Sequence, residues 1–532
     1  MEQETTAQTV LDGRTVLGIE LGSTRIKAIL IGPDHAPLAS GAYSWESRLE
    51  DGLWTYHLDD VWRGIQTAYA EMAAQVKERY GVPLSRLGAL GVSAMMHGYL
   101  PFDREGRQLA DSRTWRNTNT AQAAEELTDC LGFNIPQRWS AAHLYQAVLN
   151  GESHVGQLDF LTTLAGYVHW QLTGEKVLGV GDASGMFPID PATGDYHQDM
   201  LDRFDGLLRA HGHSFTLRQV LPKVLPAGAS AGSLTAIGAK LLDPTGTLEP
   251  GIPCCPPEGD AGTGMVATNS VAPRTGNVSA GTSVFAMAVL ERPLSRVYPE
   301  IDMVATPAGA PAAMVHCNTC TPDLDAWVHV MGEAAAAAGA ELDTTALYTM
   351  LYRKALEGEP DCGGLIACNY YSGEPVTGLS GGRPLLVRRP DSRLTLANLM
   401  RAHLYAAMAT LKLGMDILTG PEQVALDRLT GHGGLFKVEG VAQRLMASAL
   451  DVPVAVMDTA GEGGPWGMAL LAAYAVNKAP GESLTDYLSR RVFSNVRESC
   501  LSPNPKDRAG FAAFLDGYCA ALTVERTAVN AL

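Results

Sequence analysis

Two short apolar runs near the N-terminus have the β-branched pattern of strands, and a polar glycine turn separates them. The first run covers residues 15–21 (TVLGIEL) and the second covers residues 26–31 (IKAILI). The residues between them begin Gly22-Ser23-Thr24. Apolar runs of this length bounded by turn residues predict a β-hairpin.

The same pattern returns about half a chain later. Residues 276–280 and 284–290 read as strands, and Gly281-Thr282-Ser283 stands between them. Two hydroxyl-rich glycine turns at this separation indicate a duplicated architecture. We therefore expect two similar domains, each opening its sheet with such a hairpin, with both turns facing a cleft between the domains.

Helical and strand patterns alternate along the rest of the chain. A strand is predicted over residues 87–94, and the alanine-rich stretch 334–338 is typical of helix. Helical spacing of apolar residues predicts helices over residues 60–80, 118–131, 160–172, 395–418, 438–450 and 466–476. Alternating strands and helices favour an α/β fold built in layers.

The composition is that of an ordinary globular protein. Of the 532 residues, 46% are hydrophobic and 18% are charged, which excludes wholesale disorder. Forty Lys and Arg against 57 Asp and Glu give a net charge of −17, so we expect no nucleic-acid partner and no anionic membrane partner. The sequence shows no apolar window long enough for a transmembrane helix and no signal-peptide pattern, so a cytoplasmic location is expected.

The nine cysteines do not form a convincing metal motif. Cys317 and Cys320 make a lone C-x-x-C, whereas a zinc site would need a second pair or histidines at ligand spacing. We interpret the cysteines as ordinary thiols in a reducing compartment.

The first turn has the groups that a magnesium–nucleotide complex needs. Small residues let backbone N–H groups approach a phosphate closely, and nearby hydroxyls and cations add to the charge complementarity. An acid placed before the turn suits the metal and its waters. The candidate residues are Glu20, Gly22, Ser23, Thr24, Arg25 and Lys27, and the turn Gly281, Thr282 and Ser283 is a candidate for the other side of the phosphate chain. A P-loop pattern is absent from the sequence.

Two acids lie in a glycine- and proline-rich loop just ahead of the second hairpin. Glu258 and Asp260 stand within residues 256–264, PPEGDAGTG. An acid here can accept the proton of an attacking hydroxyl. Alone, this sequence would suggest a surface loop, but its place where the two domains join favours the chemical interpretation.

Further candidates are ambiguous on residue type alone. Met96 and His97 follow a predicted strand, with Trp115 and Asn117 further on, and these could bind a polyol or be core residues. Two glycine clusters precede helical stretches, and either close packing on a base and ribose or ordinary loops would explain them. The clusters contain Gly431, Gly433 and Gly434, and, within residues 461–467, Gly463 and Gly464.

Taken in order, these segments resemble the FGGY family of carbohydrate kinases, within the actin-like ATPase superfamily. The resemblance extends roughly from Val16 to Val476. Its motifs are GIELGSTRIK (18–27), SAMMHG (93–98), LTGE (172–175), DASG (182–185), EGDAGTG (258–264) and SAGTS (279–283).

The resemblance implies an α/β fold of two similar actin-like (ribonuclease H-like) domains with an interdomain catalytic cleft. The N-terminal domain, residues 1–265, would bind the sugar and carry the first phosphate hairpin. The C-terminal domain, residues 266–532, would carry the second hairpin and the adenosine-binding segments. The implied activity is phosphorylation of a small-molecule sugar by ATP with Mg²⁺, and a homodimer is a family-level expectation.

The resemblance also implies a role for each candidate. Asp260 resembles the general base, and Glu20 with Asp260 would bind the metal. The sugar would contact Met96, His97, Trp115, Asn117 and Glu258. The ATP phosphates would contact Gly22, Ser23, Thr24, Arg25, Lys27, Gly281, Thr282 and Ser283, and the adenosine would contact Gly431, Gly433, Gly434, Gly463 and Gly464.

The chain departs from the family pattern at three positions. Glu20 stands where the family usually has aspartate, and Met95 stands where it usually has glutamine. Asn117 stands where many relatives have aspartate. The strings WRNT, GDASG and GHGGLFK resemble a bacterial branch assigned to L-ribulose phosphorylation in arabinose use, with D-xylulose or another polyol or aldonate as the alternative substrate. A catalytically inactive sugar sensor and a chaperone-like or filament-forming ATPase are the alternatives from other classes.

Overall fold

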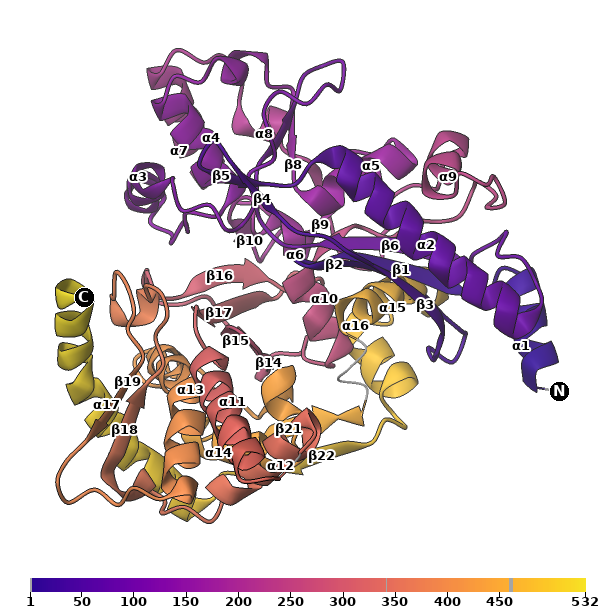
Figure 1. The fold of residues 1–532 in the computed structure, drawn as a ribbon. Helices are drawn as coiled ribbons and strands as arrows, with labels where there is room; N and C mark the ends of the chain where they lie inside the picture. The colour runs from indigo at the N-terminus through magenta and orange to yellow at the C-terminus, as the bar shows by residue number, and fades with distance from the viewer. Residues whose placement is uncertain (1, 341, 459–462) are drawn as a thin grey trace. The chain divides into compact units, whose positions relative to one another are not determined.

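The computed structural model describes residues 2–340, 342–458 and 463–532 (Figure 1). By its internal contacts the chain divides into two compact units. Unit 1 comprises Met1–Val271, Met303–Ala312 and Glu462–Asn495, and unit 2 comprises Ala272–Asp302, Ala313–Gly461 and Val496–Leu532. A late segment of the chain, Glu462–Asn495, returns to unit 1.

Unit 1 is built on a five-stranded sheet with the order β13-β6-β1-β2-β3. β1 pairs antiparallel with β2 and parallel with β6, and β13 is parallel to β6. The amide of Gly22 donates to the Arg25 carbonyl at 2.9 Å, so the predicted first hairpin is confirmed. The strands are β1 (Val16–Leu21), β2 (Arg25–Ile31), β3 (Pro37–Ser44), β6 (Ala89–Ala94) and β13 (Glu258–Gly259).

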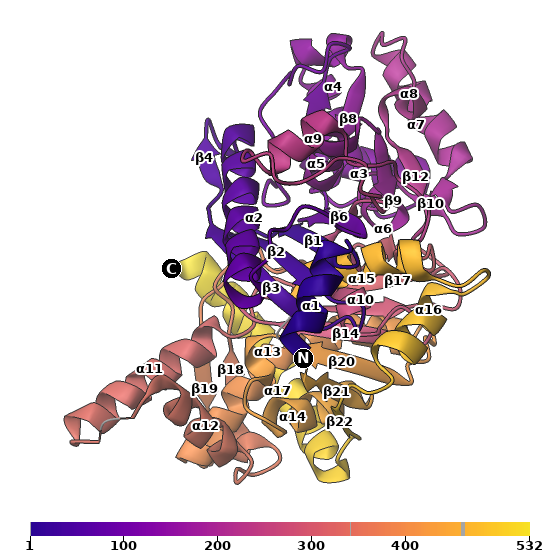
Figure 2. The same cartoon turned by 90° about the vertical axis from the view of Figure 1, so that its right-hand side faces the viewer.

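Helices cover both faces of this sheet. On one face α2 (Leu58–Tyr80) buries an apolar stripe against β2 and β3, and Figure 2 shows it running across these strands. On the other face α15 (Gly463–Asn477) packs against β1 and β6, with α10 (Asp260–Ala267) beside it. A Cβ atom on Gly18 of β1 would lie 2.2 Å from the Pro465 carbonyl oxygen, so glycine is what lets α15 approach the sheet.

Unit 2 is organised around a seven-stranded sheet with the order β16-β17-β15-β14-β20-β21-β22. β14 pairs antiparallel with β15 and parallel with β20, which is parallel to β21. The run β21-β20-β14-β15 therefore repeats the pairing of β13-β6-β1-β2, and the predicted duplication is confirmed. The strands are β14 (Thr275–Ala280), β15 (Val284–Val289), β16 (Asp302–Ala305), β17 (Pro311–Cys317), β20 (Arg428–His432), β21 (Val454–Met457) and β22 (Glu498–Leu501). Residues Met303–Ala312, which include most of β16 and the start of β17, have more of their contacts with unit 1 and are assigned to it.

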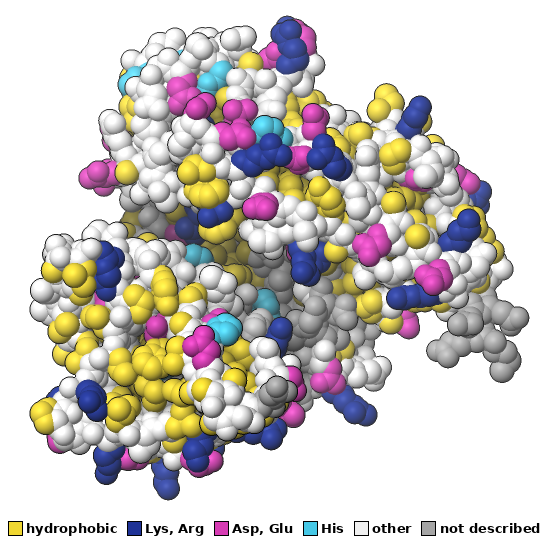
Figure 3. All heavy atoms as spheres, viewed as in Figure 1, with side chains coloured by type: hydrophobic (Ala, Val, Ile, Leu, Met, Phe, Trp, Pro, Cys, Tyr) yellow, Lys and Arg dark blue, Asp and Glu magenta, His cyan; other side chains and the backbone are white. Residues whose placement is uncertain are grey.

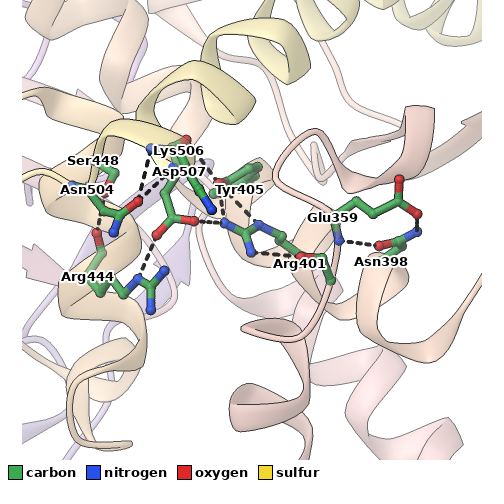
Figure 4. Close-up of polar contacts among 10 residues, drawn as sticks. Glu359, Asn398, Arg401, Tyr405, Arg444, Ser448, Asn504, Lys506 and Asp507 are labelled. Atoms are coloured by element: carbon green, nitrogen blue, oxygen red, sulfur yellow. Dashed lines mark hydrogen bonds and ion pairs between the residues drawn. The ribbon is translucent and has the colours of Figure 1, made fainter.

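The helices of unit 2 are tied together by a buried ion-pair network. Asp507, near the start of α17 (Pro505–Ala531), pairs with Arg401 of α13 (Leu396–Thr419) and with Arg444 of α14 (Val441–Leu450) (Figure 4). The Arg444 Nε–Asp507 Oδ2 distance is 2.6 Å, and Tyr405 Oη lies 3.0 Å from Arg401 Nη2. The side chains of Arg401 and Asp507 are almost fully buried, so each charge depends on its partners.

Most of the predicted elements are present, and one prediction is partly wrong. The predicted strand 87–94 corresponds to β6, and the helices predicted over 60–80, 395–418, 438–450 and 466–476 correspond to α2, α13, α14 and α15. Phe160–Thr162, predicted as the start of a helix, instead form strand β8, which pairs with β7 (Leu100–Phe102). Thr163 then caps α5 (Leu164–Thr173) by accepting a bond from the Gly166 amide at 3.2 Å. A short apolar run before a capping threonine is compatible with either structure, so its spacing could not decide.

The remaining elements complete both units. Those of unit 1 are α1 (Glu2–Leu11), β4 (Arg48–Glu50), β5 (Leu53–Thr55), α3 (Ala121–Leu131), α4 (Ser140–Leu149), β9 (Val177–Gly179), α6 (Val180–Ala183), β10 (Ile189–Asp190), β11 (Asp195–Tyr196), α7 (Gln198–Ala210), α8 (Leu217–Val220), β12 (Lys223–Leu225), α9 (Ala236–Leu242) and α16 (Leu484–Tyr487). Those of unit 2 are α11 (Pro322–Ala337), α12 (Thr344–Ala355), β18 (Leu365–Cys368) and β19 (Leu385–Arg388).

The surface and the helices agree with the composition. On the face shown in Figure 3, Lys and Arg side chains lie apart from one another and are mixed with Asp and Glu. Across the described residues, no helix has the length and apolar composition needed to cross a bilayer.

The Asp507 network gives a stability prediction. Asp507→Asn leaves Arg401 buried without its counter-charge, and such a loss typically costs about 3–5 kcal/mol. We expect the free energy of unfolding, measured by urea titration, to fall by about that amount. The control is Asp451→Asn, which removes an exposed pair with Arg508 and should cost about 1 kcal/mol or less. Equal losses in the two variants would contradict the role assigned to the network.

Candidate active site

The register of the unit 1 sheet brings the sequence motifs to one edge. Lys27, Glu20, Ser93 and Glu258 are cross-strand neighbours on β2, β1, β6 and β13. Because β1, β6 and β13 are parallel, the residues that follow them emerge at the same edge. The turn Gly22-Ser23-Thr24, the Met96–His97 pair and Asp260 thus come together from three separate stretches of sequence.

Two backbone amides fix the carboxylate of Asp260. Its Oδ1 accepts from the Met96 amide at 3.1 Å and from the Ala261 amide at 2.9 Å. These bonds lower the pKa of Asp260, but exclusion of water outweighs them and raises it above its ordinary value. The residue as a whole is partly exposed.

Glu20 lies close to Asp260 and depends on a glycine. A Cβ atom on Gly464 would stand 1.5 Å from Glu20 Oε2, so a larger residue would displace this carboxylate. Burial and then the charge of Asp260 raise the pKa of Glu20 to about 7, while Lys27 opposes the rise.

Two neighbouring acids fit a magnesium ion. The repulsion between Glu20 and Asp260 would be relieved by a cation, and both offer the oxygen ligands that Mg²⁺ prefers. In the described part of the chain, no group of three or more His, Cys, Asp or Glu side chains could hold a metal by itself.

His97 occupies a strained position at the end of β6. Its φ is 70°, and Gly98 follows with a φ of 97°, so the chain turns sharply after the strand. The His97 ring lies against Gly185 of the DASG motif, with Nδ1 3.3 Å from the Gly185 carbonyl oxygen. A Cβ atom on Gly185 would lie 2.7 Å from that nitrogen, so the motif leaves room for the ring.

A pocket opens beside His97 within unit 1. Its empty space, counted out into the solvent at its open mouth, is about 380 Å³. The predicted residues Met96, His97 and Trp115 line it together. Its walls also include Tyr56, Ser112 and Arg113, which the sequence did not single out.

Asn117 supports this pocket from behind. Its Oδ1 accepts from the Trp54 amide and its Nδ2 donates to the Trp54 carbonyl, both at 2.8 Å. An aspartate could not make the second bond, which gives a physical reason for asparagine here. The side chain is buried, and it connects the pocket loop to the middle residue of β5.

Glu258 and Asp182 form a second pair of acids, both fully buried. Glu258 accepts from the amides of Gly181 and Asp182 at 3.3 and 2.9 Å, and it is not among the residues that line the pocket. Asp182 Oδ2 accepts from Thr163 Oγ1 at 2.6 Å, while its Oδ1 has no partner among the described residues. Burial above all raises the pKa of Glu258 to about 8 and that of Asp182 to about 7. The role of Asp182 was not apparent from the sequence beyond its place in DASG.

In unit 2 the second turn is held by backbone bonds. The Thr282 carbonyl accepts from the Cys320 amide at 2.9 Å and the Gly281 carbonyl from the Thr321 amide at 3.1 Å, while the Gly281 amide donates to Ser283. Cys317 and Cys320 are buried free thiols, so here the backbone of Cys320, not its sulfur, supports the turn.

The first glycine cluster packs against the strand that leads into this turn. Gly433 has a φ of 98°, and a Cβ atom there would lie 2.4 Å from the Ala280 carbonyl oxygen. Gly431 would meet the Phe436 ring, whereas Gly434 faces open space. In the second cluster Gly463 begins α15 and Gly464 lies against Glu20, while Gly461 and Glu462 fall outside the described residues.

Comparison with known proteins decides the family. Residues 15–266 match the FGGY family of carbohydrate kinases, N-terminal domain, and residues 276–476 match the C-terminal domain of the same family. The chain belongs to the FGGY family of carbohydrate kinases.

Relatives within this FGGY family are distant in sequence. A xylulose kinase from Haemophilus influenzae is 20% identical over 413 residues, which cover 75% of this chain and 79% of that protein. A glycerol kinase from Thermococcus gammatolerans is 24% identical over 249 residues, which cover 42% of this chain but only 49% of that protein.

Solved structures share the FGGY fold. The xylulose kinase of Rhodospirillum rubrum matches with a TM-score of 0.77 at 19% identity, covering 96% of this chain and 99% of that one. The glycerol kinase of Plasmodium falciparum matches with a TM-score of 0.73 at 15% identity, covering 96% and 98%. The two-domain α/β fold is therefore confirmed.

The buried acid Asp182 gives a pH prediction. Between its ordinary pKa and the folded value of about 7, its carboxyl keeps a proton that the unfolded chain has lost, so stability falls as the pH rises through this window. Asp182→Asn removes that dependence. We expect the difference in unfolding free energy between variant and wild type to shift in favour of the variant by up to about 1.4 kcal/mol per pH unit from pH 5 to 7.

Urea titrations at a series of pH values measure this difference. Asp202→Asn, an exposed acid of α7, is the control and should follow the wild type at every pH. Parallel curves for Asp182→Asn and the wild type would show that Asp182 is ionised throughout.

Proposed function

We propose that this FGGY-family chain transfers the γ-phosphoryl group of ATP to the primary hydroxyl of a ketopentose, with L-ribulose as the first candidate and L-ribulose 5-phosphate as its product. The observation that carries the proposal is the Asp260 carboxylate, fixed by the Met96 amide and lying close to Glu20. The amide donor belongs to Met96, which lines the pocket together with His97, so a residue of the pocket wall holds the acid. We also retain a cytoplasmic location and a homodimer as expectations.

The chemistry assigned to Asp260 is that of a general base. Its two backbone bonds are both to Oδ1, so we assign the proton of the sugar hydroxyl to Oδ2. As that proton leaves, the hydroxyl oxygen bonds to the γ-phosphorus and the bond from that phosphorus to the β,γ-bridging oxygen breaks, releasing ADP. The raised pKa of Asp260 favours acceptance of the proton.

The phosphates would be held mostly by small residues. In this proposal the turn Gly22-Ser23-Thr24 and the turn Gly281-Thr282-Ser283 bind phosphate oxygens through N–H groups and hydroxyls, and Arg25 and Lys27 add positive charge. Glu20 and Asp260 would hold Mg²⁺, which when bound neutralises charge on the phosphate oxygens. Gly431, Gly433, Gly434, Gly463 and Gly464 are proposed for the adenosine.

D-Xylulose is the second candidate sugar. The support is that xylulose kinases recur among the relatives and the structures that share this fold. The chain differs from the family pattern at Met95, in the pocket wall, and at Asn117, behind it, so fold likeness does not choose between pentuloses. Trp115, Met96 and His97 are the side chains proposed to contact the sugar, and Glu258 supports the same region.

Substitution of the base tests the mechanism. General-base catalysis typically contributes about 10²–10⁴-fold, so Asp260→Asn should lower kcat by at least that range in a coupled ADP-release assay. Binding of Mg²⁺–ATP, measured by calorimetry, should be largely kept. The control Asp202→Asn should leave kcat unchanged, and near-normal turnover by Asp260→Asn would remove Asp260 from this role.

A substrate screen tests the proposed specificity. Purified protein with Mg²⁺ and ATP is offered pentuloses, hexuloses, polyols and aldonates, and kcat/KM is compared. We expect L-ribulose to give the highest value. A higher value for D-xylulose would select the second candidate, and sugar binding without ADP release would indicate a catalytically inactive sensor.

A further inference from the structure

The first phosphate turn is held from outside by two aromatic residues. Three consecutive carbonyls of the turn accept hydrogen bonds from them. Trp45 Nε1 donates to the Gly22 carbonyl at 2.7 Å and the Trp45 amide donates to that of Thr24 at 3.1 Å. Tyr56 Oη donates to the Ser23 carbonyl at 2.9 Å. None of these carbonyls can turn toward a phosphate without breaking its bond.

The two aromatic residues form one rigid element. Their rings stack with centroids 4.1 Å apart and planes inclined by 25°, and both side chains are buried. Trp45 follows β3 and Tyr56 follows β5, so the pair connects two separate parts of unit 1. We call it the Trp45–Tyr56 strap.

The strap is also a wall of the pocket. Tyr56 lines the pocket, and its Oη lies 3.5 Å from Met95 Sδ, another lining atom. Ser112, also in the lining, bonds both the amide and the carbonyl of Tyr56, at 3.1 and 2.8 Å. A molecule in the pocket therefore meets the same residue that holds the Ser23 carbonyl.

Further contacts join the loop that carries Trp115 to Trp54 and Ser47, each of which stands two residues from a member of the strap. The Thr114 amide donates to the Trp54 carbonyl at 3.1 Å, and Asn117 bonds both backbone groups of Trp54. Arg116 lies over the Trp54 ring at 3.7 Å, and its Nη1 donates to Ser47 Oγ at 2.8 Å. These contacts, together with the short backbone segments from Trp54 to Tyr56 and from Ser47 to Trp45, connect the pocket loop to the phosphate turn.

We propose that the Trp45–Tyr56 strap couples the two substrates: a sugar in the pocket stabilises the phosphate-binding conformation of Gly22-Ser23-Thr24 through Tyr56. The inference rests on the proposed function, since it takes the pocket as the sugar site and the turn as a phosphate site. Tyr56 acts here as a positioning residue. Coupling of this kind makes nucleotide binding tighter when the acceptor is present.

Thermodynamic linkage makes the inference measurable. If sugar strengthens nucleotide binding by some factor, nucleotide must strengthen sugar binding by the same factor. Tyr56→Phe deletes the bond to Ser23 and keeps the ring, so it should reduce this factor. Substitution of a residue that only stabilised the fold would change the nucleotide Kd equally with and without sugar, so the coupling factor would stay the same.

The experiment measures Kd by titration calorimetry for a non-hydrolysable ATP analogue with Mg²⁺, alone and with saturating sugar. The sugar is L-ribulose or D-xylulose, whichever the wild type phosphorylates. We expect a coupling factor above one in the wild type, and a factor about two- to tenfold lower in Tyr56→Phe, the range for one neutral hydrogen bond. The reciprocal titration, with sugar as the titrant, should give the same decrease.

A matched control separates coupling from loss of a tyrosine hydroxyl. Tyr80 is half-buried in unit 1 and donates to the Leu38 carbonyl at 3.3 Å, away from the pocket lining. Tyr80→Phe should keep the wild-type factor. Trp45→Phe, which loses the bond to Gly22, is the second test variant and should behave like Tyr56→Phe, with folding of each variant checked by thermal unfolding.

The outcomes are distinguishable. Unchanged coupling in both Tyr56→Phe and Trp45→Phe, or a factor of one in a wild type that phosphorylates the sugar, overturns the inference and leaves the proposed function intact. A wild type that phosphorylates no sugar in the screen overturns the proposed function, and the inference falls with it.

Discussion

Parallel pairing of β1, β6 and β13 is the constraint on which the site depends. It brings the ends of three strands from distant parts of the sequence to one edge, where the Met96 amide after β6 reaches the carboxylate of Asp260 after β13. A shift of this register would separate the acid from the first turn and from the pocket together. The glycines of the sheet protect the register, because Gly18 and Gly91 allow α15 to press directly on β1 and β6.

The duplicated hairpins have kept their topology and changed their supports. In unit 2, backbone amides of Cys320 and Thr321 hold the turn carbonyls, and such support is insensitive to side-chain replacement. In unit 1, three bonds hold the carbonyls of the turn, and two of them come from the side chains of Trp45 and Tyr56. This support therefore depends on residue type. The turn on the pocket side is therefore the one that substitutions can tune.

The sequence predicts the elements well because their signals are local. Both hairpins were visible as apolar runs broken by glycine turns, and helices such as α2 and α13 as long periodic stretches. Their assembly into one edge depends on pairing between residues far apart, which spacing does not encode. The sequence singled out Asp260, His97 and Trp115, and the resemblance to FGGY kinases implied their roles. In the structure His97 and Trp115 line one pocket, and Asp260 bonds the amide of Met96, which lines it too.

The supporting residues were harder to predict. Tyr56 and Trp45 look like any buried aromatic residues until their hydrogen-bond partners are known, and Asp182 was one letter of a motif. Asn117 and Glu258 were expected to face substrate, yet in the structure their polar atoms bond backbone groups of Trp54, Gly181 and Asp182. Sequence indicates which residue types are available, whereas only the fold shows which polar groups they satisfy.

The contact between Glu20 and Gly464 has an evolutionary consequence. A methyl group at position 464 would overlap the Glu20 carboxylate, whereas an aspartate at position 20, one methylene shorter, would reach less far toward it. The two positions are thus coupled, because the space open to a side chain at position 464 depends on which acid occupies position 20.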